Sequence, residues 1–364
     1  MSEKLKTFAK ILGVIFALYL FLVGIKGLSS GIKLLGGDFA NEVMSTTSNP
    51  FVALFIGILA TTLFQSSSTT TSLIVAMVGG GTITLSGAVP MIMGANIGTT
   101  VTNTIVSIGH IQRGNEFKRA FQAATIHDFF NVLAVLVLFP IEYFFGLLEK
   151  SASWLGVLLF GTLSTDEVFK SPIKAAIKWG SKKVHQLSPD NDIIFIIISV
   201  VLTFFMLYAI VKLLRSLVLE KVEAFFDTYI FKTAIRAIIF GMLLTISVQS
   251  SSITTSTVIP LAGAGVLTLR QIYPFTLGAN IGTTVTALLA SLTLNVTAMV
   301  ASFAHLFFNI FGILLVYLNP LLRDIPLKLS EKFADLAIRN KFIPITYLIV
   351  VFFLIPFLII LLGR

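Results

Sequence analysis

Two short polar stretches interrupt an otherwise apolar chain, and both have the composition of an ion-binding site. Residues 65–72 read QSSSTTTS and residues 249–256 read QSSSITTS. Hydroxyl groups can coordinate a cation through oxygen or donate a hydrogen bond to an anion, and a glutamine amide offers both an oxygen and an N–H group. The chemistry predicted at both stretches is therefore ion recognition.

Each polar stretch is followed 29 residues later (94 − 65 and 278 − 249) by the same nine residues, GANIGTTVT, at 94–102 and at 278–286. In the first copy Thr99 and Thr102 are three residues apart and share one face of a helix, as do their equivalents in the second copy. Neutral oxygen clusters of this kind favour sodium over magnesium, because magnesium demands near-octahedral geometry. The glycine pairs fit close helix packing, but such packing does not explain the asparagine and threonines.

Both regions lack fixed charge. Phe51–Gly109 contains no Asp, Glu, Lys or Arg, and Gln271–Leu322 contains none either. A buried unpaired ion is very costly, so an anion in these regions would need a cation bound beside it. The composition thus predicts joint binding of sodium and an anion, and it disfavours a proton relay through buried carboxylates.

Asp128 is the one acid inside an apolar block, and its counterpart in the second half is Leu306. We interpret Asp128 as a helix-capping residue or as a partner of Lys118 or Arg119, with an ion-binding role as the alternative. Four other polar residues of this block and its repeat are interpreted as interhelical hydrogen-bond partners: His127, Asn131, His305 and Asn309.

An enzyme with Ser66 or Ser250 as nucleophile and a histidine as base is a further alternative. No G-x-S-x-G elbow occurs in the chain, and the duplication would require two equivalent catalytic serines. We predict that the protein is not an enzyme.

The composition predicts an all-α polytopic integral membrane protein. Of 364 residues, 56% are hydrophobic and 12% are charged, with a mean hydropathy of +0.95. Apolar runs long enough to cross a membrane include 8–27, 88–108, 120–148, 193–215 and 343–362. The lysines and arginines that give the net charge of +9 lie at span ends and in loops. This distribution indicates membrane orientation and lipid contact rather than nucleic-acid binding. There is no cysteine to form a disulfide or a thiolate metal site.

The chain is an internal duplication. Gly57 matches Gly241 at an offset of 184 (241 − 57), and the two polar stretches and the two GANIGTTVT blocks share that offset. We predict four segments: a first membrane repeat (1–148), a polar connector (149–192), a second membrane repeat (193–318), and a loop with a final transmembrane helix (319–364).

Each repeat is predicted to contain a re-entrant helical hairpin around its QSSS and a discontinuous helix. Three crossings in the first repeat is an odd number, so the two repeats are predicted to be inverted relative to each other. Loop charge favours the same arrangement, because 110–119 is basic whereas its counterpart 292–297 is uncharged. A cytoplasmic N-terminus then gives seven crossings and an external C-terminus.

These motifs, together with FKRAFQAATIHDFFNVLAVLVLFPIE at 117–142, closely resemble the type II sodium/phosphate cotransporter family, including its bacterial members. The resemblance covers both repeats. It implies sodium-driven uptake of inorganic phosphate by alternating access, with co-transported sodium ions as the only cofactor and the lipid bilayer as surroundings. It also implies an integral plasma membrane protein, in particular of a bacterial inner membrane. A transporter of another small anion (sulfate, arsenate or a carboxylate) and an anion channel remain as alternatives.

The resemblance also implies site residues. The expected sodium ligands are Gln249, Ser250, Ala279, Thr283 and Thr286. Candidates for further sodium contacts are Gln65, Asn96, Thr99, Thr102 and Asn280. The expected phosphate contacts are Gln65, Ser66, Ser67, Ser68, Ser250, Ser251 and Ser252. Where electrogenic animal members carry an Asp before the 117–142 block, this chain has Arg113 and Gly114.

Overall fold

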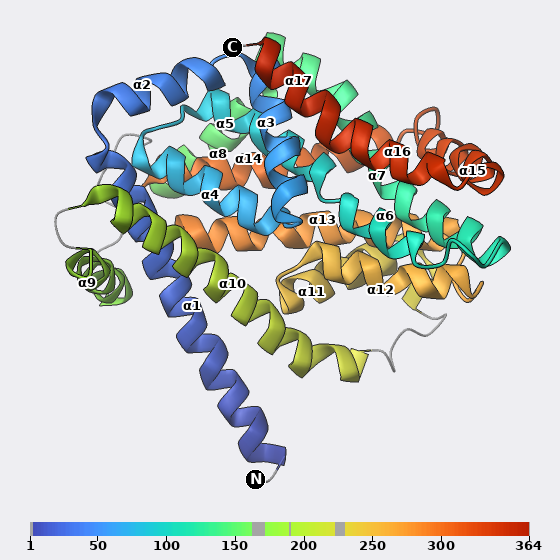
Figure 1. Ribbon diagram of the computed structural model, residues 1–364, viewed down its shortest axis with the longest axis horizontal. Coiled ribbons are helices and arrows are strands. Elements are labelled where there is room, and N and C mark those ends of the chain that lie inside the picture. Colours follow the sequence, from blue (N-terminus) through green and yellow to red (C-terminus); the bar gives the residue numbers. More distant parts are fainter. Residues whose placement is uncertain (1–2, 162–171, 189–190, 223–229, 364) are drawn as a thin grey trace.

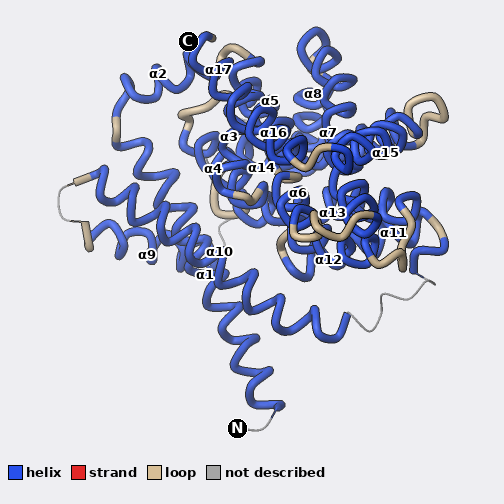
Figure 2. The backbone as a smooth tube through the Cα atoms, turned by 45° about the vertical axis from the view of Figure 1, so that its right-hand side comes forward, coloured by secondary structure: helices blue, strands red, loops and turns tan. Residues whose placement is uncertain are grey.

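The computed structural model describes residues 3–161, 172–188, 191–222 and 230–363, and every regular element in these ranges is a helix (Figures 1 and 2). Two long helices, α1 (Glu3–Leu34) and α10 (Asp192–Val222), pack along each other (Figure 1). Small residues permit this close approach, because a Cβ atom on Gly24 would lie 2.6 Å from the hydroxyl oxygen of Thr203.

Each half of the chain contains two short helices on either side of its QSSS. They are α3 (Pro50–Phe64) and α4 (Ser67–Gly80) in the first half, and α11 (Ala234–Val248) and α12 (Ser251–Gly263) in the second. The helices begin at equivalent positions because the capping residues are equivalent. Asn49 and Thr233 cap the outer arms, and Ser66 and Ser250 cap the inner arms.

The GANIGTT blocks lie on the helices that follow these hairpins. In the first half they divide between α5 (Leu85–Gly98) and α6 (Val101–Ile108), whereas in the second half one helix, α13 (Leu269–Ser291), runs through. Equivalent glycines hold these helices against the hairpins. A Cβ atom on Gly57 would lie 2.0 Å from the Met91 carbonyl oxygen, and one on Gly241 would lie 2.2 Å from the Phe275 carbonyl oxygen.

The remaining helices surround this core (Figure 1). They are α2 (Gly36–Thr47), α7 (Asn115–Phe145), α8 (Leu147–Phe160), α9 (Pro172–Gln186), η2 (Ile230–Lys232), α14 (Val296–Gly312), η3 (Ile313–Tyr317), α15 (Asp324–Arg339), α16 (Phe342–Ile349), η4 (Val350–Leu354) and α17 (Ile355–Leu362). The predicted connector and final loop therefore contain helices α8, α9 and α15, which sequence analysis did not anticipate.

Five helical segments among the described residues are long and apolar enough to cross a membrane: Leu5–Leu34, Asn115–Phe145, Asp192–Leu217, Val296–Tyr317 and Phe342–Leu362. The pair α2 and α3, bent by 100°, would make a sixth. The predicted single span over 88–108 is instead two helices, because α5 ends at Gly98 and α6 begins at Val101. The predicted discontinuous helix therefore occurs in the first half, whereas its prediction for the second half is wrong, because α13 is continuous. The all-helical membrane architecture is confirmed. The predicted seven crossings exceed the five or six segments among the described residues that are long enough to cross.

The two halves contact each other in a reciprocal way. Arg119, which follows the basic loop of the first half, donates a hydrogen bond from Nε to the Gly263 carbonyl oxygen, at 2.8 Å. Asn295, in the equivalent loop of the second half, donates from Nδ2 to the Gly79 carbonyl oxygen, at 3.3 Å. Gly79 and Gly263 are themselves equivalent (263 − 79 = 184). Reciprocal contacts of this kind are expected of two units related by a two-fold axis.

Candidate functional site

Both QSSS stretches break the backbone in the same way. Gln65 and Gln249 adopt the left-handed conformation with φ of +50° and +58°, and they are the only non-glycine residues with positive φ in the described ranges. The serines that follow, Ser66 and Ser250, are extended with φ of −154° and −153°. A left-handed residue with a side chain costs about 1 kcal/mol or more, and such strain concentrates at functional sites.

The extended serines end each break by capping the next helix. The Ser66 Oγ accepts a hydrogen bond from the Thr69 backbone N–H at 3.2 Å, and the Ser250 Oγ accepts one from the Ile253 N–H at 3.3 Å. The other predicted phosphate serines occupy the first turn of α4 or α12 and are buried: Ser67, Ser68, Ser251 and Ser252. The N-terminal ends of these helices carry positive partial charge and unpaired N–H groups, which suits an anion.

The two breaks meet inside the protein. The Ser68 hydroxyl lies 3.5 Å from the Gln249 carbonyl oxygen, to which it donates, although the two residues are 181 positions apart in the chain. The first-half serines and the second-half glutamine therefore share one region of the interior. The two polar stretches themselves, 65–72 and 249–256, contain no acidic or basic residue.

Part of the predicted sodium site is assembled in the second half. Thr286 Oγ1 donates to Gln249 Oε1 at 2.8 Å, and Gln249 Nε2 donates to the Ile246 carbonyl oxygen at 2.7 Å, which orients the amide oxygen toward Thr286. Thr283 Oγ1 donates to the Ala279 carbonyl oxygen at 3.1 Å, one turn earlier on α13. Gln249 and Thr286 line a cavity of about 260 Å³ whose other wall comes from α1 and α10.

The equivalent first-half residues are arranged differently. Gln65 is exposed, and the Thr102 hydroxyl is buried without a hydrogen-bond partner among the described residues. Thr99 Oγ1 donates to the Ala95 carbonyl oxygen at 2.9 Å, as its equivalent Thr283 does to Ala279. The structure thus brings Gln249 and Thr286 together, but it shows no corresponding bond between Gln65 and Thr102.

The candidate asparagines lie in hydrogen bonds between helices. Asn280 Nδ2 donates to Asn131 Oδ1 at 2.8 Å, and Asn280 Oδ1 lies 2.7 Å from His127 Nε2. Asn96 Nδ2 donates to the Ile92 carbonyl oxygen, on the same helix. The interpretation of His127 and Asn131 as interhelical hydrogen-bond partners is confirmed.

The other two residues given that interpretation differ. Asn309 Nδ2 donates to the Asn280 carbonyl oxygen at 3.3 Å, which again joins two helices. The His305 side chain has no hydrogen-bond partner within the part of the chain that the structure describes.

Asn103 is a buried residue that sequence analysis missed. Its Oδ1 accepts from Thr255 at 2.9 Å and from Ser256 at 3.1 Å, both in the second polar stretch, and its Nδ2 lies 3.4 Å from His127 Nδ1. The sequence could have pointed to Asn103, because this polar residue has an apolar equivalent in the second half, Ala287 (103 + 184).

Asp128 neither caps a helix nor pairs with Lys118 or Arg119, so both predicted structural roles are wrong. Asp128 lies in the middle of α7 and so caps no helix, and neither predicted cation reaches it, because Lys118 pairs with Asp335 and Arg119 bonds Gly263. The carboxylate is buried and accepts from Thr104 at 3.5 Å and from Tyr347 at 3.2 Å. These neutral donors come from α6, which packs against α7, and from α16, which packs against α6.

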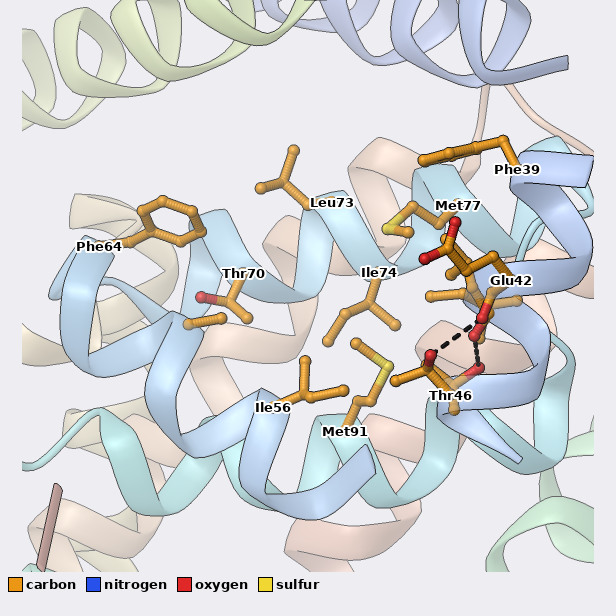
Figure 3. A pocket seen from close by; sticks show the side chains of 14 residues that line it. Phe39, Glu42, Thr46, Ile56, Phe64, Thr70, Leu73, Ile74, Met77 and Met91 are labelled. Atoms are coloured by element: carbon orange, nitrogen blue, oxygen red, sulfur yellow. Dashed lines mark hydrogen bonds between the residues drawn. The ribbon is translucent and has the colours of Figure 1, made fainter. Parts of the chain in front are cut away.

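A larger cavity adjoins the second polar stretch. It has a volume of about 650 Å³, and its polar lining residues are Thr102, Ser252, Ser256, Thr257 and Arg215. Ser252 belongs both to the lining of this cavity and to the candidate site. A third cavity, of about 410 Å³, lies between α2, α3 and α4 and is lined mainly by apolar side chains such as Leu73 and Ile74 (Figure 3). This third cavity lacks the converging polar groups of an ion site.

Known proteins resemble this chain over nearly its whole length. It is 33% identical over 436 residues to the "Sodium-dependent phosphate transport protein 2B" of Pongo abelii, which covers 93% of this chain and 63% of that protein. It is 35% identical over 420 residues to the "Sodium-dependent phosphate transport protein 2A" of Rattus norvegicus, covering 94% and 66%. The chain thus spans less than two thirds of the length of these relatives. No solved structure matches it.

The family model described as "Na+/Pi-cotransporter" matches residues 20–164 and 194–318. Each matched segment contains one QSSS and one GANIGTT block, and the unmatched interval falls in the predicted connector. With its apolar helices this match identifies an integral plasma membrane protein from a family of transporters rather than enzymes. The chain belongs to the Na+/Pi-cotransporter family.

Proposed function

We propose that this protein is a secondary active transporter that couples sodium movement to the uptake of inorganic phosphate by alternating access. The observation that carries the proposal is the meeting of two strained backbone breaks, Ser68 against Gln249, in polar stretches that themselves carry no charged side chain. An anion in such a place requires a cation beside it, which is the physical basis of coupling. The names of the relatives support phosphate and sodium as the two solutes.

The sodium site is proposed at Gln249, Ser250, Ala279, Thr283 and Thr286. The bond between Thr286 and Gln249 supports it, because that bond holds an amide oxygen and a hydroxyl oxygen at one point. Further sodium contacts are proposed, as a second site, at Gln65, Asn96, Thr99, Thr102 and Asn280.

Phosphate is proposed to bind between the starts of α4 and α12, where each helix offers N–H groups and serine hydroxyls. Its contacts would come from Gln65 and the six serines at positions 66–68 and 250–252. The hydroxyl-lined cavity of about 650 Å³ at Ser252 supports an access route to this site. We also place the protein in a bacterial inner membrane.

Uptake of radiolabelled phosphate into proteoliposomes tests the function. Uptake should require an inward sodium gradient and should fall to background when potassium replaces sodium. Flux that is independent of sodium would favour an anion channel. Stronger competition by sulfate, arsenate or a small carboxylate than by unlabelled phosphate would identify another substrate.

The two repeats are proposed to be inverted, which the reciprocal Arg119 and Asn295 contacts support. Cysteines introduced at the exposed residues Asn115 and Leu292 should react with a membrane-impermeant reagent from opposite faces of the membrane. The chain has no native cysteine, so the background should be low. Labelling of both sites from one face would refute inversion while leaving the transport assay unaffected.

A further inference from the structure

A small cavity far from the serine motifs is lined by an unusual concentration of positive charge. It has a volume of about 220 Å³, and four lysines contribute to its wall: Lys26 and Lys33 from α1, and Lys174 and Lys178 from α9. No aspartate or glutamate among the described residues lines it. The cavity is therefore electrostatically suited to an anion.

The remainder of the wall is held in place by hydrogen bonds. Asn295 donates to the carbonyl oxygen of Gly79, at the C-terminal end of α4, and its own Oδ1 accepts from the Ala298 N–H at 3.0 Å. Lys174 Nζ donates to the Leu294 carbonyl oxygen at 3.2 Å. Together with Thr293, these residues give the cavity a fixed polar floor next to the lysines.

Two of the lysines have no evident structural task. Lys33 and Lys178 are exposed and form no hydrogen bond or ion pair within the described parts of the chain. Like charges gathered around one small space repel each other, and partial burial also lowers the pKa of Lys174. A bound anion would relieve this repulsion.

Membrane orientation does not explain these lysines. Lys26 is 16 residues beyond Lys10, or about 24 Å along α1, so the cavity lies toward the end of α1 opposite the N-terminus. With a cytoplasmic N-terminus, as the sequence predicts, this is the external side, where the positive-inside rule calls for no excess of lysine. Helix α9 also lies outside the segments that match the family, 20–164 and 194–318.

We propose that this lysine cavity is an anion site for a phosphate group, distinct from the serine motifs. Lysine binds phosphate as a point charge, and four lysines with a neighbouring asparagine and threonine provide both charge and hydrogen-bond donors. The phosphate group belongs to free inorganic phosphate or to the headgroup of an anionic lipid. Because lysines supply the positive charge, binding at this site requires no sodium, and the inference stands independently of the transport function.

The first arm of the test measures equilibrium binding of radiolabelled inorganic phosphate to purified protein in choline buffer without sodium. Lys33→Gln combined with Lys178→Gln should weaken binding by about tenfold or more, equivalent to about 1.4 kcal/mol. The matched control combines Lys182→Gln with Lys183→Gln, which removes the same number of positive charges from the protein but outside the cavity, and it should bind like the unmodified protein. All four side chains are exposed, so folding should be preserved.

The second arm measures the thermal unfolding midpoint in micelles containing phosphatidylglycerol or phosphatidylcholine. If a lipid headgroup is the occupant, phosphatidylglycerol alone should raise the midpoint of the unmodified protein and of the control, but not that of the Lys33 and Lys178 double variant. Identical behaviour of double variant and control in both arms would overturn the proposal. Ser252→Ala should leave sodium-free binding unchanged, which separates this site from the proposed transport site.

Discussion

The two halves of this protein carry the same polar sequences, yet they form different sites. In the second half, Gln249 is buried and its amide oxygen accepts a hydrogen bond from Thr286. In the first half, Gln65 is exposed and the Thr102 hydroxyl is buried without a partner among the described residues. The backbone of the QSSS break is the same in both, so the difference arises in the helix that follows.

The helix that follows is continuous in the second half and broken in the first. The break between α5 and α6 is not caused by local hydroxyl bonding. Thr100 donates its hydroxyl hydrogen to the Ile97 carbonyl oxygen, but the equivalent Thr284 does the same to Ile281 within the unbroken α13. Identical residues in identical local order therefore give different backbones, so tertiary contacts decide between them.

The contacts around α6 differ from those around the equivalent part of α13. Thr104 on α6 donates to Asp128, which also accepts from Tyr347 on α16. In the second half the equivalents of Thr104 and Asp128 are Leu288 and Leu306, an apolar pair. Thr104 and Tyr347 thus link α6 and α16 to Asp128 on α7, whereas the second half has an apolar pair at the equivalent positions. The asymmetry teaches that the same nonapeptide can give a bonded pair, Gln249 and Thr286, in one half and no corresponding bond in the other.

The largest effect is expected when the two glutamines are replaced in turn and the sodium dependence of uptake is compared. Gln249→Ala should raise the sodium concentration for half-maximal phosphate uptake by about tenfold or more, because it removes an oriented amide oxygen from a buried site. Gln65→Ala should change it by less than about threefold, since that side chain is exposed. Sodium titrations of uptake into proteoliposomes measure both. Equal shifts in the two variants would abolish the distinction between the halves.

The next effect concerns Asn103, which only the first half possesses. Asn103→Ala introduces the residue found at the equivalent position, Ala287. It should lower the free energy of unfolding by about 1–3 kcal/mol, because it removes the buried amide oxygen that accepts from Thr255 and Ser256 and the Nδ2 group beside His127. Unfolding midpoints in detergent measure the loss. Ala287→Gly, a small change at the equivalent site, serves as the comparison, and a larger loss there would contradict the assigned role of Asn103.

The smallest effect compares the two threonines. Thr286→Val should destabilise the protein by about 1 kcal/mol, since Gln249 Oε1 would lose its buried donor. Thr102→Val should be neutral or slightly stabilising, because it removes a buried hydroxyl that has no partner among the described residues. The two substitutions are chemically identical and lie in identical nonapeptides, so each controls for the other. Destabilisation by Thr102→Val as large as that by Thr286→Val would show that Thr102 makes an equivalent bond.

The sequence by itself determined the class of the protein and the local form of its repeated parts. Apolar composition requires a membrane, and in a membrane the backbone must satisfy its hydrogen bonds within helices. Capping residues set the helix starts, so Ser66 and Ser250 begin α4 and α12 at equivalent positions. These features depend on residues within one turn of each other, and a sequence displays them directly.

The tertiary structure alone decided which side chains meet. The bond between His127 and Asn280 joins residues 153 positions apart, and the approach of Ser68 to Gln249 spans 181. Asp128 bonds Tyr347 rather than the predicted cations, because Lys118 and Arg119 lie 10 and 9 residues earlier on the same helix, about 15 Å and about 14 Å away along its axis. The two copies of GANIGTTVT form a broken helix in one half and a continuous helix in the other. Local helix propensity is a weak determinant of structure, and the surrounding tertiary contacts override it.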